Sequence, residues 1–251
     1  MSINESAAMP APRVTLPSPG RGTAWFLLFA VVYLVATLIY FAGLGIYMAV
    51  SQPGVGPEEV EAMIHGNLVA HIPGMYLTQF ICLLPLILLA SRFSTQTISQ
   101  TLSIKPVKLR LLAIWLGVYA LYQIAAIALH SFLNIPMDDF TQQIATQRNL
   151  ATILTLVVLA PVLEELVFRG YLFKAWRHSW LGASGTIMLT SVLFLGLHLG
   201  QYGALVMGQL FIFAIILGIA REKTGSIITP WLLHTANNLF SAILLMYLGW
   251  A

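Results

Sequence analysis

Residues 150–176, "LATILTLVVLAPVLEELVFRGYLFKAW", decide the fold, because this run is long and apolar enough to cross a membrane yet carries charges in its middle. A spanning helix needs about 20 predominantly apolar residues. The only charged residues in the run are Glu164, Glu165, Arg169 and Lys174. A charge near the centre of a spanning helix costs roughly 2.5 to 3.5 kcal/mol on insertion scales. Such residues therefore need partners or a function.

The composition of the whole chain agrees with a membrane protein. Of 251 residues, 59% are hydrophobic and 8% are charged, whereas an ordinary soluble domain is about 25% charged. So few charges cannot cover a water-exposed surface, and we expect the lipid bilayer to replace much of the solvent. The basic residues are scattered without aromatic interleaving, which argues against nucleic acid as a partner. The single cysteine, Cys82, lies in an apolar run and is expected to pack in the core.

Apolar runs predict an all-α polytopic membrane helical bundle with about seven transmembrane helices. Residues 1–22, rich in Pro, Ser and Gly, are expected to form a disordered cytoplasmic tail rather than a secretory signal, and residues 23–251 the transmembrane domain. The second span is the least regular, because Pro73, Gly74 and Pro85 interrupt it. The predicted spans are 24–50, 68–90, 111–129, 150–176, 181–199, 204–220 and 228–248.

The distribution of Lys and Arg predicts the orientation. A cytoplasmic N-terminus leaves only Arg148 outside and places the C-terminus outside, in a membrane that we expect to be a bacterial inner membrane. The polar stretch 137–149 is then an external loop or a short surface helix. At or near the inner side lie Arg13, Arg21, Arg92, Lys105, Lys108, Arg110, Arg169, Lys174, Arg177, Arg221 and Lys223.

The charges inside span 150–176 divide into a pair and a remainder. Glu165 and Arg169 are four residues apart, so they share one helix face and are expected to form an ion pair. Glu164 is turned about 100° away from Glu165 and needs another partner. Pro161, three residues earlier, lacks an N–H and frees a carbonyl one turn back, which is tolerable only beside protein or a wet cavity.

Candidate partners for Glu164 come from later spans. "FLGLH" places Phe194 and His198 four residues apart, and "HTANN" places His234 and Asn238 four residues apart. Together with Glu164 they offer a base, two imidazoles and an amide, which are groups that activate a water and stabilise an oxyanion. Counting residues from the expected inner surface, at 1.5 Å per residue, places Glu164 and His198 at a similar depth of about 20 Å. The same count places His234 nearer the inner surface.

The remaining histidines, by contrast, lie near predicted helix ends or in loops. We expect His65, His71, His130 and His178 to be solvated. Asn238 also has a purely structural interpretation, since a polar side chain between membrane helices commonly bonds a backbone carbonyl.

The order Glu164-Glu165-x-x-x-Arg169, Phe194-x-x-x-His198 and His234-x-x-x-Asn238 resembles the CAAX protease and bacteriocin-processing (CPBP, or ABI) family of intramembrane proteases. The resemblance covers about residues 150–245. It implies a helical bundle with a catalytic cavity inside the membrane and a membrane-anchored or lipid-modified peptide as substrate.

By this resemblance, Glu164 is the general base and works with His198 to activate a water. His234 and Asn238 hold the oxyanion, and Glu165, Arg169 and Phe194 support the site. No cofactor is favoured, although Glu164, His198 and His234 are possible zinc ligands. The sequence contains no H-E-x-x-H motif.

Three alternatives remain open. "GASG", residues 182–185, matches the G-x-S-G of rhomboid serine proteases, with Ser184 as nucleophile and His234 as its base. A proton-coupled transporter would use Glu164, His198 and His234 as a relay. A non-catalytic scaffold or immunity protein would keep the fold without hydrolysis.

Overall fold

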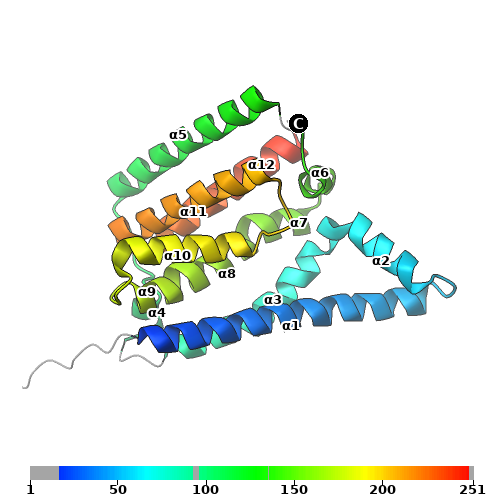
Figure 1. The fold of residues 1–251 in the computed structure, drawn as a ribbon, viewed down its shortest axis with the longest axis horizontal. Coiled ribbons are helices and arrows are strands. Elements are labelled where there is room, and N and C mark those ends of the chain that lie inside the picture. Colours follow the sequence, from blue (N-terminus) through cyan, green and yellow to red (C-terminus); the bar gives the residue numbers. More distant parts are fainter. Residues whose placement is uncertain (1–16, 93–95, 135, 249–251) are drawn as a thin grey trace, which may run out of the picture.

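The computed structural model of the chain describes residues 17–92, 96–134 and 136–248. These ranges are mostly helical and contain no strand. The predicted all-α polytopic membrane bundle is confirmed. Figure 1 shows most of the long helices side by side, with the hairpin that joins α1 to α3 extending beyond them.

The described helices, in chain order, fall into long and short elements. The long helices are α1 (Pro19–Ser51), α3 (Leu68–Ser91), α5 (Leu109–Leu133), α10 (Gly182–Gly196), α11 (Ala204–Thr224) and α12 (Ile228–Met246). Short helices are α2 (Pro57–Gly66), α4 (Ile98–Thr101) and α6 (Asp139–Thr146). One continuous helical run alternates between α-helical segments and π-helical segments, which are labelled η. Its segments are α7 (Leu150–Leu154), η1 (Thr155–Leu159), α8 (Ala160–Glu165), η2 (Leu166–Leu172) and α9 (Phe173–Trp176).

Each predicted span corresponds to a helix, but the number that cross a membrane stays a prediction. Five helices are long and apolar enough to span: α1, α3, α5, the run from α7 to α9, and α11. The helix α10 has only 15 residues, about 22 Å at 1.5 Å per residue, against a hydrocarbon core of about 30 Å. Pro73 and Pro85 both lie inside α3, which stays helical despite them.

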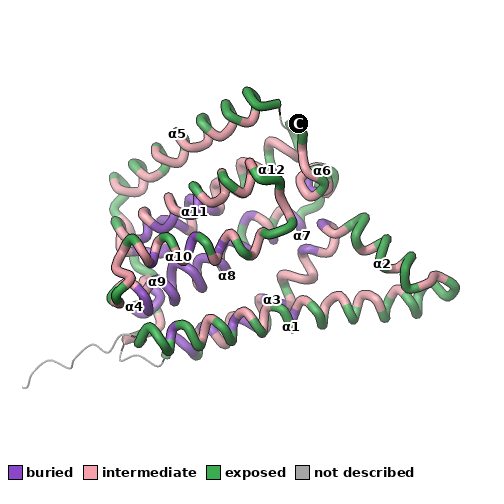
Figure 2. The backbone as a smooth tube through the Cα atoms, viewed as in Figure 1, coloured by how far each residue is buried: buried purple, intermediate pink, exposed green. Residues whose placement is uncertain are grey.

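The run from α7 to α9 is the central helix of the bundle. Half of the residues in its apolar 18-residue stretch are buried, whereas 6% are buried in the corresponding stretch of α5. Figure 2 shows buried residues on the segments around α8 and α9, whereas α1 and α5 are mostly intermediate or exposed. Exposed apolar side chains such as Leu38, Leu121 and Ile124 cover these outer helices. Lipid tails can solvate such surfaces, which therefore suit an integral membrane protein.

Close packing ties α1 to the central helix. A Cβ at Gly22 would collide with the Cβ of Ala175, so α1 approaches α9 as closely as its missing side chain allows. The indole N–H of Trp176 donates to the Thr23 hydroxyl at 3.2 Å. Because α1 begins at Pro19, the last four residues of the tail predicted for residues 1–22 belong to this helix. Residues 1–16 of that tail lie outside the described part.

Candidate active site

The ion pair predicted in the central helix is confirmed. Nη1 of Arg169 donates to Oε1 of Glu165 at 3.0 Å, and their side chains are 0% and 1% exposed. The second Arg169 nitrogen, Nη2, donates to the carbonyl of Ala214 in α11 at 3.0 Å. The guanidinium also lies over the ring of Phe194, 4.7 Å from its centroid. Arg169 therefore fastens the central helix to α10 and α11.

His234 lies between the two glutamates. Its Nδ1 is 3.0 Å from Oε1 of Glu165, and its Nε2 is 3.7 Å from Oε2 of Glu164. A carboxylate that is paired with Arg169 only accepts, so Nδ1 carries the hydrogen and Nε2 faces Glu164. The depth expected for His234 from its sequence position was therefore wrong, since α12 places it level with both carboxylates.

Glu164 has a second partner that the sequence did not reveal. The hydroxyl of Tyr76, in α3, donates to Oε1 of Glu164 at 3.3 Å. The glutamate is 7% exposed, so this hydrogen bond replaces part of its lost hydration. Oε1 is thus held by Tyr76 while Oε2 faces His234.

His198 lies just beyond a helix rather than inside one, which corrects the predicted span 181–199. The helix α10 ends at Gly196, and the His198 ring packs on Phe194 with centroids 4.9 Å apart. Its Nδ1 is 3.0 Å from the Phe194 carbonyl oxygen. Because a carbonyl only accepts, Nδ1 carries the hydrogen and Nε2 is left as the acceptor of the neutral ring. Both site histidines therefore have their tautomer fixed through Nδ1.

Asn238 donates a hydrogen bond to a backbone carbonyl near Pro161. Its Nδ2 donates to the Leu156 carbonyl at 2.7 Å. In η1 the N–H of Ala160 bonds the carbonyl of Thr155, five residues back. In that pattern the next donor would be residue 161, but a proline has no N–H, so the Leu156 carbonyl needs another partner. The structural interpretation of Asn238 is supported, and its role at an oxyanion stays a prediction.

Replacing Asn238 by leucine is expected to reduce the free energy of unfolding in detergent by about 1 to 3 kcal/mol, because the Leu156 carbonyl loses its donor. Adding Pro161→Ala restores an N–H at position 161 and should recover part of this loss. Denaturant unfolding of both variants beside the wild type measures the effect. Wild-type stability for Asn238→Leu alone would contradict the assigned bond.

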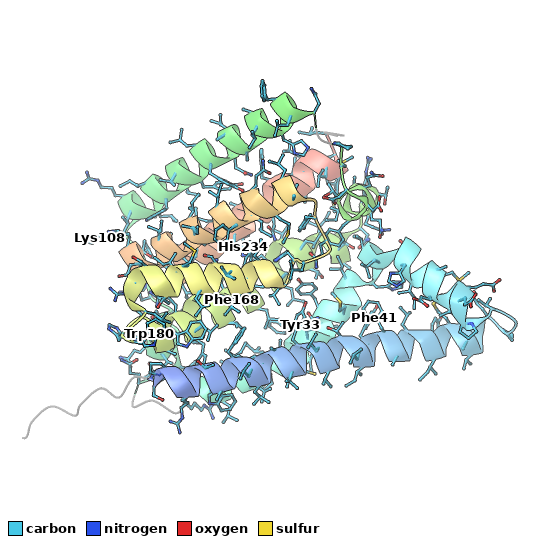
Figure 3. All side chains as sticks on the ribbon, in the orientation of Figure 1. Tyr33, Phe41, Lys108, Phe168, Trp180 and His234 are labelled. Carbon is cyan, nitrogen blue, oxygen red and sulfur yellow. The ribbon has the colours of Figure 1, made fainter. Side chains whose placement is uncertain are left out.

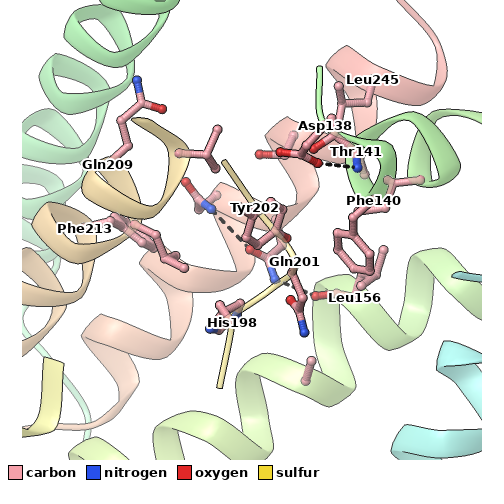
Figure 4. Close-up of a pocket in the computed structure, with 18 of the residues that line it drawn as sticks. Asp138, Phe140, Thr141, Leu156, His198, Gln201, Tyr202, Gln209, Phe213 and Leu245 are labelled. Carbon is pink, nitrogen blue, oxygen red and sulfur yellow. Dashed lines mark hydrogen bonds between the residues drawn. The ribbon is translucent and has the colours of Figure 1, made fainter. Parts of the chain in front are cut away.

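A cavity of about 510 Å³ is lined by Glu164, His198, His234 and Asn238 together. Its wall also includes polar residues from other elements, among them Tyr202 and Gln209. Figure 4 shows His198, Gln201 and Tyr202 on the connection before α11, with Asp138 and Phe140 from the α6 region nearby. The structure thus brings four predicted site residues to one cavity, although His198 and Glu164 share it without a direct hydrogen bond among the contacts of the described residues.

A second, apolar pocket of about 350 Å³ meets the first at Glu164. Tyr33 and Tyr76 line both spaces. The other lining residues are Phe26, Phe29, Ala30, Leu34, Leu83, Leu163, Val167, Phe168, Gly196 and Leu197. Glu164 therefore lies where a polar cavity and an apolar pocket join.

Several lining residues were missed or misjudged from the sequence. Tyr76, Gln123 and Gln209 are polar groups within apolar runs, and that signal was visible. His130 lines the cavity, and His71 is 3.4 Å from the Tyr40 hydroxyl, so neither is simply solvated as expected.

Ser184 lies at the far end of α10 from the cluster. It is exposed and ten residues before Phe194, about 15 Å along a helix, whereas Phe194 packs on His234 with centroids 5.6 Å apart. The predicted alternative of a Ser184–His234 dyad is not supported by this placement.

The fit of a metal ion can be judged from the donor set. Among the described residues, no group of three or more His, Cys, Asp or Glu side chains is arranged to hold a metal. Of the possible zinc ligands, His234 bonds Glu165 through Nδ1, which leaves its Nε2 available, as in many histidines that bind a metal. That the site works without a cofactor stays a prediction.

Comparison with known proteins identifies the segment that holds these residues. Residues 146–240 match the family model described as "Type II CAAX prenyl endopeptidase Rce1-like". These residues are thus similar to the Rce1-like proteins of the CPBP family. The Rce1-like segment contains Glu164, His198, His234 and Asn238. The resemblance read from the three motifs is therefore confirmed.

Two uncharacterised bacterial proteins are similar to this chain. A 24.3 kDa protein of Escherichia coli is 31% identical over 130 residues, 48% of this chain and 58% of that protein. The chain thus matches little more than half the length of this relative. The protein YyaK of Bacillus subtilis is 25% identical over 240 residues, 89% of this chain and 79% of its own. No solved structure matches the chain.

Proposed function

We propose that the protein is an intramembrane endopeptidase that hydrolyses a peptide bond of a membrane-associated, lipid-modified or membrane-anchored protein. The observation that carries the proposal is the placement of Glu164. Its carboxyl group is almost fully buried in an apolar bundle, lies beside His234 and borders a cavity that His198 also lines. The similarity of the segment to an endopeptidase family supports the same reaction.

In the proposed reaction, Glu164 acts as the general base. A water in the cavity attacks the peptide carbonyl carbon while Glu164 accepts a proton from that water. The C–N bond then breaks, and the same proton passes to the leaving amine. The products are an amine and a carboxylic acid, which then releases its remaining proton to the solvent. His198 presents an unprotonated Nε2 in its neutral form and can hold the attacking water by accepting its second hydrogen.

The neighbouring residues position the base. Arg169 holds Glu165, which fixes the tautomer of His234 beside Glu164. Asn238 is a positioning residue in this mechanism, because its amide supports the backbone of the central helix. No step of the mechanism passes through a metal ion.

The lining of the cavity bears on the substrate. Its described residues include the carboxylic acids Glu164 and Asp138 but no Lys or Arg. A carboxylate of the substrate would find no lysine or arginine among these residues. We therefore expect the segment around the cleaved bond to be neutral or cationic.

Purified protein in liposomes tests the proposal with a library of membrane-anchored peptides. We expect products whose summed mass equals substrate plus one water, unchanged by a metal chelator. Ser184→Ala is the matched control and should cleave like the wild type, since Ser184 lies far from His234. Loss of cleavage in Ser184→Ala, or loss with chelator that zinc restores, would contradict the mechanism. Proton uptake dependent on Glu164 without any cleavage would favour the transporter alternative.

A further inference from the structure

The cavity reaches one end of the bundle only, as far as its described lining shows. Its lining includes Pro136 to Asp138 before α6, Gln201 and Tyr202 before α11, and Leu245 near the end of α12. We call this region the cavity end. Contacts hold its parts together: Gly203 N–H donates to Asp138 at 3.3 Å, and the rings of Phe140 and Tyr202 are 5.3 Å apart.

The opposite end of the bundle is basic. Of the Lys and Arg residues that the structure describes, all but Arg148 and Arg169 belong to segments at this end, which we call the basic end. Figure 3 shows Lys108 and Trp180 there, away from His234. The basic residues are Arg21, Arg92, Lys105, Lys108, Arg110, Lys174, Arg177, Arg221 and Lys223.

Contacts confirm that these segments, distant in sequence, meet at the basic end. Nη2 of Arg221 donates to the Ser103 hydroxyl at 2.6 Å, and Ser226 donates to the Lys105 carbonyl at 2.6 Å. Arg177 pairs with Glu222 at 2.6 Å. None of these residues lines the cavity.

Lys and Arg near the ends of spanning helices mark the cytoplasmic side, and acidic residues contribute little to this rule. Arg169 does not count toward it, because its charge is paired with Glu165 inside the bundle. The rule therefore predicts that the basic end is cytoplasmic and that the cavity end faces the other side.

We propose that the cavity takes its substrate from the extracytoplasmic side of the membrane. The inference rests on the proposed proteolysis and narrows its substrates to membrane-anchored peptides whose cleavable segment lies at the outer surface. A peptide whose cleavable segment lies on the cytoplasmic side would have to cross the packed basic end, where Arg221 and Arg177 hold α11 to the neighbouring segments.

Thiol labelling tests the sidedness without any assay of proteolysis. In a Cys82→Ser background, expressed in a bacterial inner membrane, single cysteines replace Gln201 at the cavity, exposed Asp139 at the cavity end or exposed Lys108 at the basic end. A membrane-impermeant maleimide added to intact spheroplasts should label Gln201→Cys and Asp139→Cys, and should label Lys108→Cys only after lysis. The reverse pattern overturns the inference.

Two single-span substrates separate the inference from the proposed function. They carry the same cleavable segment on the outer or the inner side of their anchor and are expressed with the wild-type protein. Cleavage of the outer form alone is expected, and cleavage of the inner form alone, or of both equally, overturns the inference. Cleavage of neither, with the expected labelling pattern, contradicts the proposed proteolysis instead of the orientation.

Discussion

Replacing Glu164 by glutamine is expected to lower the rate of peptide hydrolysis by about 10²- to 10⁴-fold, the usual contribution of a positioned general base. Glutamine has nearly the same shape, and its amide oxygen can still accept the Tyr76 hydroxyl that now bonds Oε1 of Glu164. It cannot take a proton from water at neutral pH. The rate is measured with purified variants in liposomes under saturating substrate.

The control for this substitution is Glu58→Gln, which makes the same chemical change at an exposed position in α2. It should leave the rate unchanged. Thermal unfolding of Glu164→Gln should match the wild type within about 1 kcal/mol, because one charge is removed from a buried site without opening a cavity. A Glu164→Gln variant that cleaves at the wild-type rate would exclude Glu164 as the base.

Replacing Arg169 by leucine is expected to reduce the free energy of unfolding by about 3 to 5 kcal/mol, the cost of breaking a buried ion pair from one side. The carboxylate of Glu165 would stay buried beside His234 without its cation, and the Ala214 carbonyl would lose its donor. Denaturant titration in mixed micelles measures this loss.

Two further variants separate the ion pair from a general effect of removing an arginine. Arg148→Leu removes an exposed arginine and should change stability by no more than about 0.5 kcal/mol. Glu165→Gln combined with Arg169→Leu removes both charges and should be more stable than Arg169→Leu alone. Equal stability of the single and double variants would mean that the uncompensated charge of Glu165 does not cause the loss.

The spans were predictable because they depend on a single property of the sequence. An apolar run of the right length forms a helix in lipid almost whatever its neighbours are, since the backbone must satisfy its own hydrogen bonds. The predicted span 150–176 and the run from α7 to α9 coincide. The length of α10 was overestimated because apolar residues continue past Gly196 into a turn.

Part of the site was predictable from helix periodicity. The spacing of Glu165 and Arg169 gave their ion pair, since both residues lie on one helix. The contact of Tyr76 with Glu164 depends on how α3 packs against α8, which an apolar surface pattern does not specify. The sequence could only indicate that Glu164 needed a partner.

The backbone near Pro161 shows another limit. Pro161 correctly predicted a backbone carbonyl that lacks its usual N–H donor. Because the turns of η1 are wider than α-helical turns, this carbonyl belongs to Leu156. Such π-helical turns have no clear sequence signature and commonly occur at functional sites. Likewise, residues 137–149 were expected to form an external loop or a short surface helix. They contain the short helix α6, but this stretch also contributes to the cavity wall, because α6 packs against α12 and α3.

Glu164 is proposed to activate a water that attacks the peptide carbonyl directly. A single turnover in water enriched in oxygen-18 tests this role, with protein in excess over a membrane-anchored peptide that is cleaved. We expect one heavy oxygen in the new carboxylate of the product and none in the protein. Heavy oxygen in the side chain of Glu164, with an unlabelled product, would show that the glutamate attacks the substrate itself and would exclude its role as the general base.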